Sequence, residues 1–120
     1  MGLLCDGETP EWHPAKPELK NAVKQCIDLV QSCNEESKIS LAEIAENYAF
    51  SYSDVDVHLV GAKTAQEVEH ALRAYARAQQ LQLYAFGKYE DDNIQSIYSQ
   101  IKTILEPFAE YTWLSPPSNA

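Results

Sequence analysis

The 120-residue sequence is poor in basic side chains, with 9 lysine and arginine residues against 18 aspartate and glutamate residues. A nucleic-acid-binding surface needs clustered cations that neutralise phosphates, so this shortage argues against DNA or RNA as a partner. No apolar run approaches the roughly 18 residues that cross a bilayer, and the first residues lack the basic start of a signal peptide. We therefore expect no membrane partner and a cytoplasmic protein.

Cysteine is also scarce. Cys5, Cys26 and Cys33 are odd in number and have no Cys-x-x-Cys spacing, so neither a disulfide framework nor a metal site is predicted. Free thiols in a reducing compartment are expected instead. Cys26 falls on the apolar face of a predicted helix, where it is expected to be inert core.

The rest of the composition, 45% hydrophobic and 22% charged, is that of an ordinary globular domain. Helical spacing of apolar residues predicts four helices, over about 17–33, 40–51, 64–80 and 91–107. Pro17 suits the first position of the first helix, and Ser40 with Glu43 forms a capping box at the second. Arg73 and Arg77 are interpreted as part of a solvated helix face.

One strand is predicted at about 55–60, because apolar residues alternate there with Asp56 and His58. Gly61 ends the alternation, and Thr64 with Glu67 forms a second capping box. Such a turn leaves backbone N–H groups free at a helix start, which suits a phosphate or another anion. One strand cannot form a sheet. The chain is therefore either a small helical bundle with an extended segment or the end of a larger α/β fold, and the order of elements favours the second.

Several stretches resemble the aldo-keto reductases, most closely their L-galactose dehydrogenase-like branch. They are Gly2-Leu3-Leu4, Pro10-Glu11-Trp12-His13-Pro14-Ala15, Leu59-Val60-Gly61-Ala62 and Ile104-Leu105-Glu106-Pro107. The resemblance covers nearly the whole chain. It implies that residues 1–120 are a single partial domain, the C-terminal fragment of a (β/α)8 TIM barrel from the end of strand 7 through the C-terminal helix.

The resemblance also implies a nicotinamide cofactor, NAD or NADP, and assigns positions to it. The pyrophosphate would lie along Gly2, Leu3 and Leu4. The adenosine phosphate or ribose would be held by Gly61, Ala62, Lys63 and Thr64, and the adenosine end would meet Glu67, His70 and Ala71. Many relatives carry Arg or Gln at the position of Glu67. A carboxylate there repels a 2′-phosphate, so NAD is favoured, although Lys63 argues the other way.

A further departure concerns adenine. Where the family usually has a Glu-Asn pair whose Asn binds adenine, this sequence has His70-Ala71. Adenine hydrogen bonding is therefore expected to be weaker.

The loop around Trp12 and His13 allows two interpretations. It is either a surface loop with its tryptophan packed on the body, or a substrate loop that folds over a ligand with Trp12 as the anchor. The sequence does not decide between them.

The resembling family transfers a hydride between a nicotinamide and a sugar, L-galactose-like, hydroxyl or carbonyl group, using a Tyr proton donor with Asp, Lys and His partners. No such set in this sequence matches the family motif, so no catalytic residue is predicted. The chain alone is expected to be inactive and to supply only part of a cofactor site. Two alternatives stay open: a non-catalytic helical segment that docks on a partner, and a small helical domain that keeps nucleotide binding.

Overall fold

The computed structural model describes residues 2–33, 39–52, 54–84 and 92–113, and the side chains of all of these except 81–84. The described residues form four α-helices and one 3-10 turn. They are α1 (Pro17–Ser32), α3 (Leu41–Phe50), α4 (Ala65–Tyr84), α5 (Asp92–Leu105) and η1 (Glu106–Phe108). The four predicted helices are confirmed to within a few residues, except that α4 is longer. Asp91, the other predicted start of the last helix, lies outside the described residues.

The helix starts follow the local sequence. Pro17 occupies the first position of α1, where its missing N–H is not needed. The hydroxyl of Ser40 accepts a 3.0 Å hydrogen bond from the backbone N–H of Glu43 at the start of α3. The α-helical stretch of α5 ends at Leu105, and Pro107 lies in the 3-10 turn that follows. These boundaries were predictable because neighbouring residues set them.

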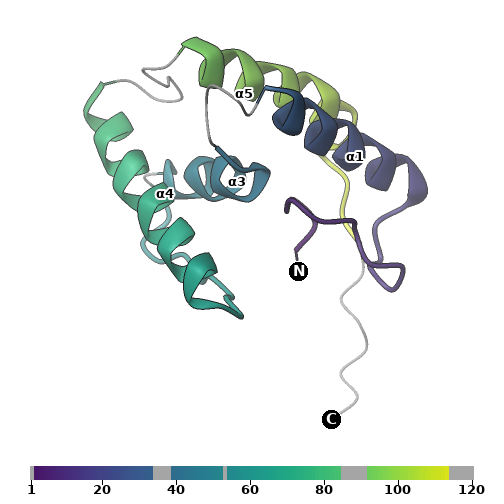
Figure 1. The fold of residues 1–120 in the computed structure, drawn as a ribbon, viewed down its shortest axis with the longest axis horizontal. Helices are drawn as coiled ribbons and strands as arrows, with labels where there is room; N and C mark the ends of the chain where they lie inside the picture. The colour runs from purple at the N-terminus through teal and green to yellow at the C-terminus, as the bar shows by residue number, and fades with distance from the viewer. Residues whose placement is uncertain (1, 34–38, 53, 85–91, 114–120) are drawn as a thin grey trace.

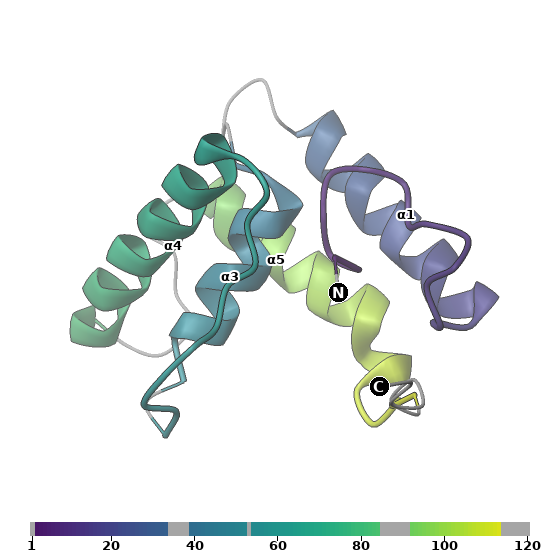
Figure 2. The same cartoon turned by 90° about the horizontal axis from the view of Figure 1, so that it is seen from below.

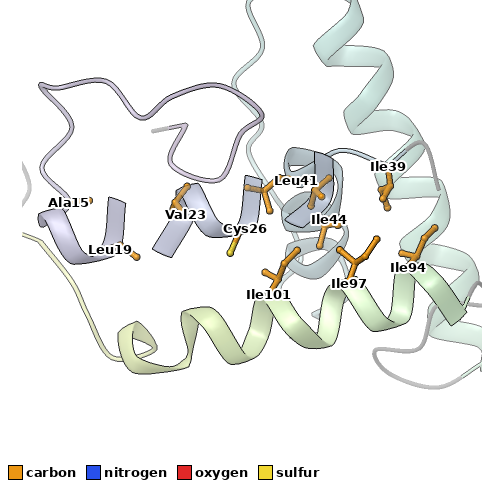
Figure 3. Packing of buried hydrophobic residues seen from close by; sticks show 11 residues of the cluster. Ala15, Leu19, Val23, Cys26, Ile39, Leu41, Ile44, Ile94, Ile97 and Ile101 are labelled. Atoms are coloured by element: carbon orange, nitrogen blue, oxygen red, sulfur yellow. The ribbon is translucent and has the colours of Figure 1, made fainter. Parts of the chain in front are cut away.

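The helices pack as two pairs, α1 on α5 and α3 on α4, with α3 between α5 and α4 (Figure 1, Figure 2). The main core lies where α1, α3 and α5 meet (Figure 3). Its labelled members are Ala15, Leu19, Val23, Cys26, Ile39, Leu41, Ile44, Ile94, Ile97 and Ile101. Cys26 is fully buried within this core, as predicted, and none of the three cysteines, all of which are described, forms a disulfide.

The α3–α4 interface is built differently. Its apolar part is small, consisting of Phe50, Ala74 and Ala78. The buried amide of Asn47 donates a 3.3 Å hydrogen bond to the carbonyl of Ala74. The alanines let the two helices approach closely, and polar contacts then fix their register.

The predicted strand at about 55–60 is wrong. None of the described residues is in a strand, and 55–60 is an extended segment with a bend at Asp56. Val57 and Leu59 are 72% and 96% exposed, so the apolar side of the alternation faces solvent. Only His58 packs inward, its ring 5.3 Å from that of Phe50. A strand needs a neighbour for its backbone donors and acceptors, and the described part of the chain offers none.

The predicted C-terminal part of a TIM barrel is contradicted for the same reason. A barrel wall is a closed sheet of paired strands. The described residues instead build an all-helical arrangement whose core lies between helices.

Candidate functional site

The start of α4 carries the predicted anion-binding turn. The hydroxyl of Thr64 accepts a 3.2 Å hydrogen bond from the backbone N–H of Glu67, and the Glu67 carboxylate accepts one of 3.3 Å from the N–H of Thr64. These two bonds confirm the capping box. The same carboxylate oxygen also accepts from the N–H of Lys63. That bond is the main reason why the pKa of Glu67 is lowered, so its negative charge is held in place.

The turn therefore offers an anion an incomplete set of donors. The backbone N–H groups of Ala65 and Gln66 have no hydrogen-bond partner in the described part of the chain. Lys63 is exposed beside them and adds a positive charge. The Glu67 carboxylate, however, takes up two donors and adds a negative charge. A phosphodiester with one charge fits this arrangement better than a phosphomonoester with two.

His70 and Ala71 lie one turn further along α4 and are half-buried. Glu46 on α3 is near His70. Burial raises the pKa of Glu46, and the proximity of His70 opposes that shift. Seven of the predicted cofactor residues thus lie at one place, from Gly61 to Ala71.

The other three predicted cofactor residues lie elsewhere. Leu3 and Leu4 pack against the α1–α3–α5 core, and Gly2 has a positive φ of 70° that suits glycine. Among the described residues, no hydrogen bond or ring contact joins Gly2, Leu3 or Leu4 to the turn. The structure therefore does not bring the predicted pyrophosphate and adenosine positions into contact with each other.

The loop that contains Trp12 and His13 is held by the histidine. His13 is 2% exposed, its Nδ1 accepts a 3.1 Å hydrogen bond from the N–H of Ala15, and its ring meets that of Trp113 at 5.3 Å. Burial, and then the positive charge of Lys20, lowers the pKa of His13. Trp12 is 71% exposed. The tryptophan is therefore not packed on the body, as the first interpretation assumed, and its role as an anchor over a ligand stays a prediction.

A second contact attaches the same loop to α3. The carboxylate of Asp6 accepts a 2.9 Å hydrogen bond from the N–H of Leu41, the first residue of that helix. Lys20 also donates to the carbonyls of Pro10 and Glu11. Three separate attachments leave the loop little freedom to close over a ligand as a lid.

Two tyrosines, Tyr48 and Tyr98, are poor proton donors. The hydroxyls of Tyr48 and Tyr52 share a hydrogen bond, which together with burial raises the pKa of Tyr48 to about 12. Burial raises the pKa of Tyr98 as well. A general acid at neutral pH needs the opposite shift, so neither residue is suited to protonating a carbonyl.

A cavity beside the extended segment was missed by the sequence analysis. It has a volume of about 320 Å³, and we call it the His58 cavity. Its lining comes from the end of α3, the extended segment and the middle of α4: Phe50, Tyr52, Val55, Asp56, His58, Tyr75 and Gln79. No sequence signal joins these three segments, because only the packing of α3 on α4 brings them together.

The described ranges contain neither a membrane-spanning helix nor a metal-binding cluster. In the four ranges, no helix combines the length and apolar character that a bilayer crossing requires. No group of three or more His, Cys, Asp or Glu side chains in those ranges is arranged to hold a metal ion.

Comparison with known proteins finds a dehydrogenase that is similar to this chain. Over 115 aligned residues, the chain is 32% identical to L-galactose dehydrogenase from Arabidopsis thaliana. The aligned region covers 96% of this chain and 32% of that enzyme. The chain thus spans about a third of the length of this curated relative. No protein-family model matches the chain. No solved structure matches it either. Over nearly its whole length, the chain is similar to part of a dehydrogenase.

Proposed function

We propose that this chain is part of a nicotinamide-dependent oxidoreductase of the aldo-keto reductase type, and that the start of α4 binds the adenosine end of the cofactor. The observation that carries the proposal is the 32% identity to L-galactose dehydrogenase over 96% of the chain. The unpaired N–H groups of Ala65 and Gln66, beside Lys63, support a phosphate position at this turn. When bound, the cofactor supplies hydride transfer between its nicotinamide and a sugar hydroxyl or carbonyl group.

Glu67 makes NAD the preferred cofactor in this proposal. Its carboxylate is fixed next to the donors by hydrogen bonds from Lys63 and Thr64. A 2′-phosphate would bring a second negative charge to the same turn, and like charges at short range repel. NAD, whose ribose has only hydroxyls at that end, avoids this repulsion.

The chain alone is proposed to be inactive. Tyr48 and Tyr98 have pKa shifts in the direction that hinders proton donation. The contribution of this chain would be to hold and orient part of the cofactor, with the proton donor supplied from elsewhere. Turnover of L-galactose with NAD by the purified 120-residue chain would contradict this.

Calorimetric titration with NAD and NADP tests the cofactor assignment. We expect the wild-type chain to bind NAD more tightly than NADP. Glu67→Gln retains a side-chain acceptor but removes the charge. It should reduce the ratio of the NADP dissociation constant to the NAD dissociation constant by about two- to fivefold, which is the size of an exposed charge interaction. Glu69→Gln is the matched control, because Glu69 is exposed on the same helix outside the capping box. Tighter binding of NADP by the wild type, or no binding of either dinucleotide, would contradict the assignment.

A second candidate is a non-catalytic segment that docks on a partner protein. Val57 and Leu59 on the extended segment and Leu72 on α4 are all more than half exposed, and apolar surface of this kind favours association. This candidate would be supported if the sedimentation coefficient of the chain rises with concentration and if Leu59→Lys makes that rise smaller. A chain that stays monomeric and melts sharply would argue against it.

A further inference from the structure

We propose that the His58 cavity binds a small organic ammonium ion, with alkyl groups on a positively charged nitrogen. The lining residues of the cavity include none of the residues of the proposed dinucleotide site. Its volume of about 320 Å³ lies at the lower end of the range of small-molecule sites, about 300–1,000 Å³. The cavity therefore suits a compact ligand.

Four of the seven lining residues, Phe50, Tyr52, His58 and Tyr75, carry aromatic rings. The Phe50 and Tyr75 rings have centroids 5.7 Å apart and planes at 88°, and the Phe50 and His58 rings are 5.3 Å apart at 90°. Tyr52 adds a third phenyl ring to the lining. Rings set at right angles present faces in more than one direction. Each face carries negative charge density that attracts a cation, and the attraction increases as the cation loses water.

The charge of the lining residues also favours a cation as the ligand. Asp56 contributes a carboxylate, and the described lining contains no lysine or arginine. The chain as a whole has a formal charge of -9. A cation would be attracted to the cavity, whereas a phosphate would be repelled from it. This distinguishes the cavity from the start of α4, where Lys63 is present.

His58 also belongs to the lining. Its Nε2 has no hydrogen-bond partner among the described residues, but this nitrogen is buried and not accessible to solvent, so a ligand in the cavity does not reach it. The expected contacts of the ligand are therefore with the ring faces and with Asp56, and they do not require an N–H on the charged nitrogen.

Titration of the full chain with trimethylammonium chloride at constant ionic strength, followed by NMR, tests the proposal. The amide and ring signals of His58 and Tyr75 should shift and saturate. Tetramethylammonium, which carries the same charge, should also give shifts that saturate. The same titration with tert-butanol, an uncharged molecule close to tetramethylammonium in shape, should give no saturable shift. Saturable binding of tert-butanol with equal affinity would overturn the proposal.

Two substitutions locate the binding. Tyr75→Leu and Asp56→Asn should each weaken trimethylammonium binding by about two- to fivefold, the first through the loss of a ring face at an exposed site and the second through the loss of an exposed charge. Both residues are exposed, so the fold should tolerate the changes, and far-UV circular dichroism checks this. Asp54→Asn is the control, because it removes the same charge from the same segment but lies outside the lining. Unchanged affinity in Tyr75→Leu and Asp56→Asn, or shifts that never saturate in the wild type, would overturn the proposal.

Discussion

Arg77 on α4 donates a 2.7 Å hydrogen bond to the carboxylate of Glu43 on α3, whose side chain is only 8% exposed. The two residues are 34 positions apart in the chain. Glu43 also supplies the N–H that the Ser40 hydroxyl caps, so one residue joins the start of α3 to the middle of α4. The interpretation of Arg77 as part of a solvated face is therefore wrong.

Removing Arg77 should destabilise the fold. Arg77→Met leaves the Glu43 carboxylate buried without its cation, and the free energy of unfolding should fall by about 1–3 kcal/mol. This loss is smaller than that expected for a fully buried ion pair, because Arg77 is partly exposed. Chemical denaturation measures this. Arg73→Met is the matched control, since Arg73 is exposed one turn earlier on α4 without an ion pair to a described residue, and it should change stability by less than about 0.5 kcal/mol. Equal effects of the two variants would contradict the ion-pair account.

The attachment of the N-terminal loop to α3 gives a second prediction. Asp6→Ala removes the acceptor for the N–H of Leu41 and should cost about 1 kcal/mol, as loss of a helix cap does. Asp6→Asn retains an acceptor oxygen and should recover most of the loss. Glu8→Ala changes an exposed acid in the same loop that has no hydrogen bond to the described residues of α3, and it should be neutral. If Asp6→Ala is also neutral in denaturation, the loop is not held there.

The buried His13 should make stability depend on pH. Its folded pKa lies below the ordinary value of 6.5, so below pH 6.5 the unfolded chain binds a proton that the folded chain does not. Stability should therefore fall as the pH decreases from about 6.5 towards the folded pKa. His13→Phe keeps a ring in place but does not titrate, and it should flatten this part of the profile. Trp12→Ala, at the exposed neighbour, should leave the slope unchanged. A slope that His13→Phe does not alter would count against a buried, neutral histidine.

The three cysteines should differ in reactivity. Burial raises the pKa of the Cys26 thiol to about 11, whereas Cys5 and Cys33 are half-buried. A thiol reagent at neutral pH should modify two cysteines in the folded chain and the third only after denaturant is added, because the thiolate is the reactive form. Mass spectrometry of the modified peptides identifies them. Rapid labelling of Cys26 without denaturant would show that the core around α1 opens readily.

Local features of this fold were predictable from the sequence, and non-local ones were not. The capping box of Thr64 with Glu67 forms as predicted, because it needs only residues three positions apart. At Ser40 and Glu43 only the bond from the Glu43 N–H to the Ser40 hydroxyl forms, because the Glu43 carboxylate bonds to Arg77 on another helix. The prediction of a strand at about 55–60 was wrong because an alternating pattern of side chains does not supply a neighbouring strand to pair with. Its apolar side, which includes Leu59, is consequently exposed.

The candidate site shows the same division. The turn from Gly61 to Thr64 was predictable from one glycine and one capping box, and its donors lie where the pattern indicated. The burial of His13 rather than Trp12 depends on Trp113, about a hundred residues away in sequence. Asp56 and Tyr75 line one cavity only because α3 packs on α4. Contacts of this kind depend on the packed structure.

The proposal that the start of α4 binds the adenosine end of NAD is tested most directly by NMR chemical-shift mapping on the isotope-labelled 120-residue chain. NAD should shift the backbone amides of Lys63, Ala65, Gln66 and Glu67 in a saturable way, because these donors lie at the turn. Lys63→Ala should weaken the binding, and the Tyr75 signals should stay unchanged. Shifts confined to other parts of the chain, or no saturable shift with NAD, would contradict the proposed site.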